Sequence, residues 1–364
     1  MLRSLGGAPS HRRGAQRGTQ PSTVVMVVVH VSVRKHLVEG YRPNRALSNS
    51  VERPMWILVL FLLARSNVYI VTDEADAVLA ILDARAAGRA VTDADWQRVF
   101  KSEGYVRLQK REHAMKRAFE DDAFRTFVTS PELLAKRATL RRALDRVKGA
   151  DLDALAKRAF AYLPPSAHID ATIYPVIKPA TNSFVFEGNA IFKYLDGDEP
   201  LAYFEETVAH EMHHIGYGTA CAHTGQKWLG AFGEGFAAYA ASGGLHGHPY
   251  ANAAPDVRAA WASGIADYPG QFAQLQQFFE DIAEAKLKGD EIDKRGFQFF
   301  GLVGPWYTVG WKMAAVIEEE LGRDALINAF CDSATLMATY NRAADAHAKR
   351  TGERLPHWSA RGGG

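Results

Sequence analysis

The stretch "VAHEMHHIGY", residues 208–217, places three histidines and one glutamate within five positions of an apolar run. Histidine is otherwise scarce, with 13 in 364 residues. His210, Glu211 and His214 form an HExxH pattern. On a helix, residues i and i+4 lie on one face a turn apart, so His210 and His214 can offer two imidazole nitrogens to one zinc ion. The stretch therefore predicts a metal-binding helix.

The other two polar residues of this stretch are expected to do different work. Glu211 can reach the edge of the site without being a ligand, where a carboxylate takes a proton from metal-activated water and passes it to the leaving group. His213 projects about 100° from His214 around a helix. We therefore expect His213 to be a packing or supporting residue and not a ligand.

A catalytic zinc takes three protein ligands and leaves a fourth position for water. The metzincin extension of HExxH would need Gly at 217 and His at 220, but the chain has Tyr217 and Ala220, and His223 comes three residues too late. The other standard solution is a glutamate on a second helix. Glu234, in "WLGAFGEGFAAYAASGG" (residues 228–244), supplies one.

Gly233 and Gly235 flank that glutamate. Glycine inside a helix is unfavourable by about 1 kcal/mol unless close packing requires it, and we expect the close approach to be to the HExxH helix. For Glu234 alone, a surface glutamate is the alternative. His246 and His248 lie in a later loop, which is either a plain polar loop, a rim of the cleft or a source of a substitute third ligand.

These residues resemble the gluzincin group of zinc metallopeptidases, which carry HExxH followed by a distant glutamate, and "GEGFAAY" is similar to the third-ligand segment of M1-type aminopeptidases. Residues from about 170 to 345, with "YPVIKPATNSFVF" and "GPWYTVGWKMA", resemble a family of zinc-dependent peptidases of unknown substrate. The resemblance implies one zinc ion per chain on His210, His214 and Glu234. It also implies a small sheet packed on the HExxH helix, with an edge strand lining the cleft.

Two further residues enter through the same resemblance. Gluzincins often stabilise the oxyanion with a downstream Tyr or His, which implies a catalytic role for Tyr307. A packed helix tyrosine is the alternative. Glu187 precedes HExxH by about the distance of the amine-anchoring glutamate of M1 enzymes, but the surrounding motif is absent, so aminopeptidase activity is only weakly indicated.

The chain as a whole predicts a mostly helical α+β fold. Residues 73–163 have helical periodicity, with Thr92 and Ser130 as expected N-caps and Pro131 at a first helical position. Residues 168–179 and 182–197 are β-branched and aromatic and predict strands, and helices return from Leu201 to about Ala348. We expect four parts along the chain: a basic disordered leader and signal peptide at 1–66, an N-terminal helical domain at 67–165, a peptidase-like catalytic domain at 166–349 and a flexible tail at 350–364.

The leader also bears on localisation. "MWILVLFLLARSN" (residues 55–67) is a ten-residue apolar run behind Arg53 that is typical of a secretory signal peptide. We expect translation to start near Met55, cleavage shortly after Ala64, and export to the periplasm or the extracellular space. The alternative is a buried strand in a cytoplasmic protein. No other stretch is long enough to cross a membrane.

Charge and cysteine content narrow the partners. Residues 1–54 carry nine basic and two acidic residues, so residues 55–364 have 34 basic and 39 acidic ones and show no footprint for nucleic acid. Cys221 and Cys331 match no zinc spacing, and either two thiols or one disulfide fits the sequence.

The most specific hypothesis is a zinc peptidase acting on a peptide or protein. Two alternatives stay open at this level: a peptidase fold that binds metal for recognition only, and a helical interaction protein in which HExxH is coincidental.

Overall fold

The computed structural model describes residues 65–179, 183–197, 199–221 and 226–359. This part of the chain is an α+β fold of mostly helices with a four-stranded mixed sheet. The strands are β1 (Arg65–Ile70), β2 (His168–Val176), β3 (Phe184–Phe186) and β4 (Ala190–Tyr194). The helices are α1 (Asp73–Ala86), α2 (Asp93–Phe100), α3 (Glu103–Ala114), α4 (Asp121–Val128), α5 (Pro131–Lys148), α6 (Leu152–Phe160), α7 (Leu201–Ala220), α8 (Gly233–Ser242), α9 (Pro255–Ala266), α10 (Tyr268–Ala283), α11 (Asp290–Gln298), α12 (Pro305–Leu321), α13 (Arg323–Cys331) and α14 (Ser333–Thr351). None of these helices is long and apolar enough to cross a bilayer.

The sheet has the order β1-β2-β4-β3, with β1 and β4 parallel to β2 and β3 antiparallel to β4. The expected strands at 168–179 and 182–197 are confirmed as β2, β3 and β4. The fourth strand was not predicted: β1 begins at Arg65, two residues inside the range assigned to the leader, and pairs along its length with His168–Ile173. The rest of the proposed signal segment lies outside the described residues.

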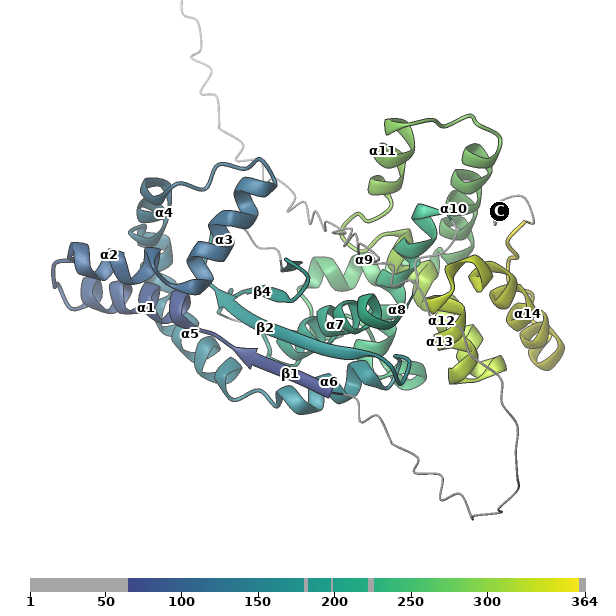
Figure 1. The fold of residues 1–364 in the computed structure, drawn as a ribbon, viewed down its shortest axis with the longest axis horizontal. Helices are drawn as coiled ribbons and strands as arrows, with labels where there is room; N and C mark the ends of the chain where they lie inside the picture. The colour runs from purple at the N-terminus through teal and green to yellow at the C-terminus, as the bar shows by residue number, and fades with distance from the viewer. Residues whose placement is uncertain (1–64, 180–182, 198, 222–225, 360–364) are drawn as a thin grey trace, which may run out of the picture.

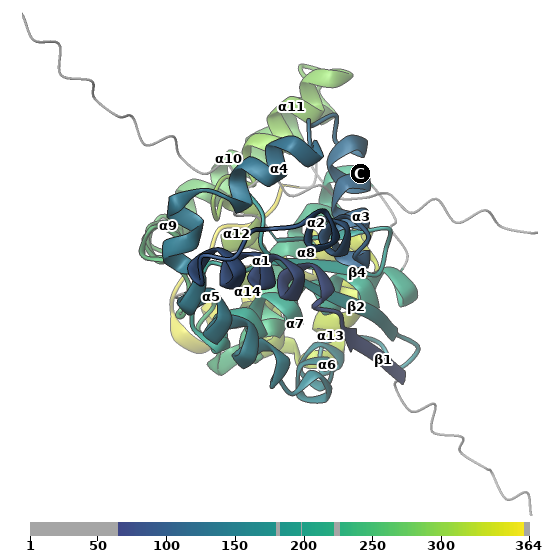
Figure 2. The same cartoon turned by 90° about the vertical axis from the view of Figure 1, so that its left-hand side faces the viewer.

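Helices α1 to α5 gather at one end of the sheet and the C-terminal helices at the other, with α7 and α8 between them (Figure 1). The expected caps are confirmed. The Thr92 side chain accepts from the Asp95 amide in a capping box, and Ser130 accepts from Leu133 ahead of Pro131. Figure 2 shows β1 along the edge of the sheet, on the side from which α6 also packs.

Helix α7 carries the HExxH pattern and is packed against β2, α6 and α8. A Cβ added at Gly216 would lie 2.3 Å from Leu163 and 3.2 Å from Ile169, so this part of α7 sits close to the sheet because glycine leaves the room. The hydrophobic core runs through both the N-terminal helices and the C-terminal part. The parts of the chain before and after residue 165 share one sheet and one hydrophobic core. The domain boundary expected there stays a prediction.

The glycines beside Glu234 have a different partner from the one we expected. A Cβ at Gly235 would lie 2.2 Å from the Trp311 amide nitrogen and 2.4 Å from the Tyr307 carbonyl oxygen, both on α12. Gly310 of α12 is equally confined by the Phe232 carbonyl oxygen at 2.5 Å. Nothing lies within 4 Å of a Cβ at Gly233. The close helix crossing is therefore between α8 and α12, not between α8 and α7.

Two features tie down the C-terminal region. Trp358 and Leu355 are buried, and the Trp358 amide donates to Asn341 while its carbonyl accepts from the same side chain. Within the segment after residue 350, these two side chains pack on the rest of the protein, while residues 351–354 are exposed; the expected flexible tail stays a prediction. Cys221, after α7, and Cys331, at the end of α13, form a disulfide across 110 residues.

Candidate metal centre

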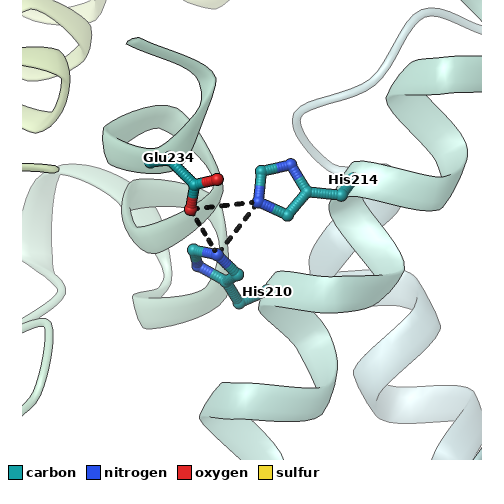
Figure 3. A group of neighbouring side chains, drawn as sticks. All are labelled: His210, His214 and Glu234. Atoms are coloured by element: carbon teal, nitrogen blue, oxygen red, sulfur yellow. Dashed lines mark hydrogen bonds and ion pairs between the residues drawn. The ribbon is translucent and has the colours of Figure 1, made fainter. Parts of the chain in front are cut away.

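Three side chains converge where α7 meets α8. His210 and His214 project from one face of α7 toward Glu234 in the first turn of α8 (Figure 3). The two Nε2 atoms are 3.0 Å apart, and Glu234 Oε2 lies 3.3 Å from His210 Nε2 and 3.4 Å from His214 Nε2. The structure thus brings together the three residues that the sequence predicted as ligands. Two of them come from α7 and the third from α8.

The donor set fits a zinc ion. An atom centred in a triangle of these three distances would lie about 1.9 Å from each corner, close to the roughly 2.0–2.2 Å of zinc bonds to imidazole nitrogen and carboxylate oxygen. Two imidazoles and one carboxylate are also the ligands of one common type of catalytic zinc site. Glu234 is buried, while the His214 side chain is 26% exposed, so the group is open on the His214 side.

The charges of this group depend on one another. Burial by itself would raise the pKa of Glu234, but the neighbouring His214 and His210 hold it well below its usual range. Burial lowers the pKa of His214, and the carboxylates of Glu234 and Glu211 more than offset this, so that pKa is raised. The Glu234 carboxylate therefore stays negative in its buried position because two histidines face it. A bound cation would have the same effect on its pKa.

Glu211 lies on the same helix and is 3% exposed. Its Oε2 atom is buried without a hydrogen-bond partner among the described residues. Burial raises the pKa of this carboxyl, and His210 and His214 only partly compensate. A buried carboxylate oxygen without a partner is costly, and one beside a candidate metal site is available to a bound water or substrate.

Tyr307, in the first turn of α12, is at the same site. Its ring stacks on the His210 ring with centroids 6.5 Å apart, and its hydroxyl hydrogen-bonds to Glu234. Burial, together with the charge of Glu234, raises the pKa of this phenol well above its usual value. In this arrangement the hydroxyl orients the Glu234 carboxylate, a role that the sequence had not suggested.

The remaining histidines of the sequence analysis lie apart from the group. His213 is buried, and its Nε2–H donates to the Tyr162 carbonyl oxygen at 3.3 Å, which ties α7 to the end of α6. Burial lowers the pKa of His213 to about 3, so it is neutral. His223 lies outside the described residues. His246 and His248 fall in no metal-compatible group among the residues that the structure describes.

Glu187 is in the turn between β3 and β4, where Lys110 and Arg107 of α3 pair with its carboxylate. These two cations occupy the group that would have anchored a substrate amine. The aminopeptidase interpretation gains no support from this position.

Sequence reasoning missed Tyr250 and Glu206. The Tyr250 amide donates to Glu206 Oε1 at 2.7 Å, and Glu206 lies on α7 one turn before His210. The Tyr250 ring packs edge-on against Tyr307 at 6.4 Å. The sequence shows that Glu206 lies four residues before the ligand His210. It does not show that Tyr250 folds back to contact Glu206.

A second group of histidine and glutamate was also not predicted. His347 Nδ1 lies 3.0 Å from Glu320 Oε1, with Glu319 alongside. Here Arg350 Nη2 pairs with both glutamates, at 2.6 Å from Glu319 and 2.5 Å from Glu320. The cationic position of this group is already filled by the protein.

One comparison with known proteins is informative. A family model described as "Putative zinc dependent peptidase (DUF5700)" matches residues 83–349, which is most of the chain and includes every residue of the candidate metal centre. No curated protein and no solved structure matches the chain.

Proposed function

Because the chain belongs to this family of zinc-dependent peptidases, we propose that it is a gluzincin-type metallopeptidase whose one zinc ion is held by His210, His214 and Glu234. The observation that carries the proposal is the convergence of these three donor atoms within 3.4 Å of one another, on two helices. The family supports a peptidase, and this ligand pattern supports the gluzincin type.

The reaction divides among the residues as follows. Zinc held at this site supplies a Lewis acid that polarises the scissile carbonyl and activates water. Glu211 acts as general base toward the attacking water and then as general acid toward the leaving amine, because its buried carboxylate oxygen faces no protein donor. Glu234 is assigned as a ligand and not as the base because its Oε2 atom faces the Nε2 atoms of both histidines.

Tyr307 has two roles in this proposal. In the resting site its hydroxyl holds the Glu234 carboxylate in place, as groups behind a metal ligand commonly do. During the reaction the phenol of Tyr307, whose ring stacks on that of the ligand His210, stabilises the developing oxyanion.

The direct test uses the purified chain, assayed for bound metal and for cleavage of a mixed peptide library with and without a zinc chelator. We expect about one zinc per chain and cleavage that the chelator abolishes and added zinc restores. Stoichiometric zinc without any cleavage would favour a metal-binding protein used for recognition. Absence of zinc would favour coincidence of the HExxH pattern.

We also propose that the protein is exported, with a signal peptide in residues 55–67 that begins near Met55. The disulfide between Cys221 and Cys331 supports this, because such bonds persist mainly in oxidising compartments. A fusion that starts at Met55 should be secreted and cut shortly after Ala64. A mature native protein whose N-terminus lies upstream of Met55 would contradict the proposal.

A further inference from the structure

A cavity of about 360 Å³ opens beside the metal centre, between the segment after α8 and the helices α9 and α12. Its walls are mostly rings and aliphatic groups: Pro249, Tyr250, Trp261, Ile265 and Trp311. Trp261 packs against both Tyr250, at 5.2 Å between ring centroids, and Trp311, at 5.5 Å. The volume lies in the range of sites that bury small ligands or single side chains.

Tyr250 links the wall of the cavity to the metal centre by ring contacts. One side of this residue forms a wall of the cavity, and its ring contacts Tyr307, which in turn stacks on the ligand His210. The Tyr250 amide is also bound by Glu206, one turn before His210 on α7. The wall of the cavity is thereby fixed to the helix that carries two of the three ligands.

Tyr250 has a φ of 63°, a backbone conformation that residues other than glycine rarely adopt. Such a conformation is unfavourable and persists only where the surroundings enforce it, most often at functional sites. Here the Glu206 hydrogen bond and the two ring contacts enforce it. Their combined effect is to hold the phenol ring between the cavity and the metal centre.

We propose that this cavity is the subsite that receives a large apolar or aromatic side chain of the peptide substrate, next to the scissile bond. The proposal rests on the proposed peptidase function and adds its substrate class. Apolar walls favour such a side chain through burial, with about 25 cal/mol per Å² of apolar surface removed from water. The carboxylate of Glu206, which accepts from the amide of the wall residue Tyr250, disfavours an acidic one. Arg258, the charged residue of the lining, already donates to the Ala253 carbonyl oxygen.

The first measurement is binding without catalysis. The full chain, loaded with zinc, is titrated with N-acetyl-L-phenylalaninamide and with N-acetyl-L-alaninamide while tryptophan fluorescence is followed. We expect the phenylalanine probe to change the emission of Trp261 and Trp311 and to saturate, and the alanine probe to bind at least about tenfold more weakly. Equal, non-saturating effects of the two probes would overturn the proposal.

The second measurement is selectivity of cleavage. Matched peptides that differ only by Phe, Leu, Ala or Asp on one side of the scissile bond should differ in kcat/KM by at least about tenfold in favour of Phe and Leu. Trp261→Ala should reduce this ratio and leave the zinc content unchanged. Ile265→Trp, which fills the cavity, should do the same if Trp261→Ala does not fold. Phe297→Ala, at an exposed ring on α11, is the control that should keep the ratio.

The two proposals fail in different ways. A zinc-loaded chain that binds the phenylalanine probe but cleaves no peptide would contradict the peptidase function and support the cavity. A chain that cleaves the Phe and Ala peptides equally, with no change in Trp261→Ala, would support the function and overturn the subsite.

Discussion

Two groups of histidine and glutamate in this chain differ in what neutralises them. At the metal centre, His210, His214 and Glu234 face one another across 3.0 to 3.4 Å, and no Lys or Arg of the described residues pairs with them. In the second group, Arg350 contacts Glu319 and Glu320 and closes the network around His347.

The difference separates a candidate metal site from a structural ion network. Proximity of ligand-type side chains is common to both groups, so proximity alone does not identify a metal site. What distinguishes the first group is that its buried carboxylate is kept negative mainly by two histidines. In addition, Oε2 of Glu211, the residue after His210, is buried without a hydrogen-bond partner among the described residues. The comparison therefore predicts zinc in the first group and none in the second.

The largest effect is expected from removing a ligand. Glu234→Ala should lose stoichiometric zinc, and with it activity and some stability, because metal binding contributes to the folded state. Glu320→Ala is the matched control from the second group and should keep one zinc per chain. Metal analysis after dialysis measures both. Zinc retained in Glu234→Ala and lost in Glu320→Ala would reverse the comparison.

The next effect separates the base from the ligands. Glu211→Gln keeps the size of the side chain but removes the proton acceptor, so turnover should fall by about 10²–10⁴-fold while zinc content stays near that of the native chain. Glu319→Gln, at an exposed position of the second group, should change neither quantity. If Glu211→Gln instead loses the metal and keeps activity in the remaining loaded fraction, then Glu211 is a ligand and its assignment as base is wrong.

A smaller effect is expected at Tyr307. Tyr307→Phe removes the hydroxyl that orients Glu234 and should weaken zinc affinity or lower kcat by about 10–100-fold. A competition titration with a chelator and steady-state kinetics tell the two roles apart: weaker zinc indicates orientation of the ligand, and lower kcat at full zinc indicates oxyanion stabilisation. Tyr340→Phe, which loses a buried hydroxyl contact with Tyr268 far from the metal centre, serves as control. No change in either quantity for Tyr307→Phe would leave it a packing residue.

The smallest effect tests the second group by pH. The Arg350 guanidinium, followed by His347, lowers the pKa of Glu320 below its usual 4.5. A lowered folded-state pKa stabilises the fold above the unfolded value and loses that contribution as pH falls through the folded value. Arg350→Ala should therefore unfold at a temperature lower by no more than about 2 °C at pH 7, and the difference should shrink toward pH 3. A difference that grows in acid would contradict this account.

The sequence was most informative where the contact lies within one helix, between residues three or four positions apart. The HExxH pattern needs only the geometry of one helix, and Thr92 and Ser130 cap their helices through contacts within three residues. Glu234 was selected by its place in a second apolar helix, and the structure puts it beside the histidines.

The sequence was least informative where the partner comes from a distant element. Gly235 was expected to approach the HExxH helix, but the backbone that needs its missing side chain belongs to α12, around Gly310. Trp358 looks like part of a polar tail in the sequence, yet it packs against Phe272 and Phe232 of the core. The Tyr250 contact with Glu206 likewise depends on a fold-back that no local pattern encodes.

The bond between Cys221 and Cys331 has a mechanical consequence. If the chain were pulled from its two ends, tension would pass through the sulfur atoms and bypass the 110-residue segment between them, hiding a contour length of roughly 360–400 Å. Glu234 lies inside this loop and bears no tension. His210 and His214 lie outside it, on the part of the chain that bears the tension. A single-molecule stretching trace would thus separate the histidines from their glutamate while the loop stayed unextended, and a reductant would lengthen the trace.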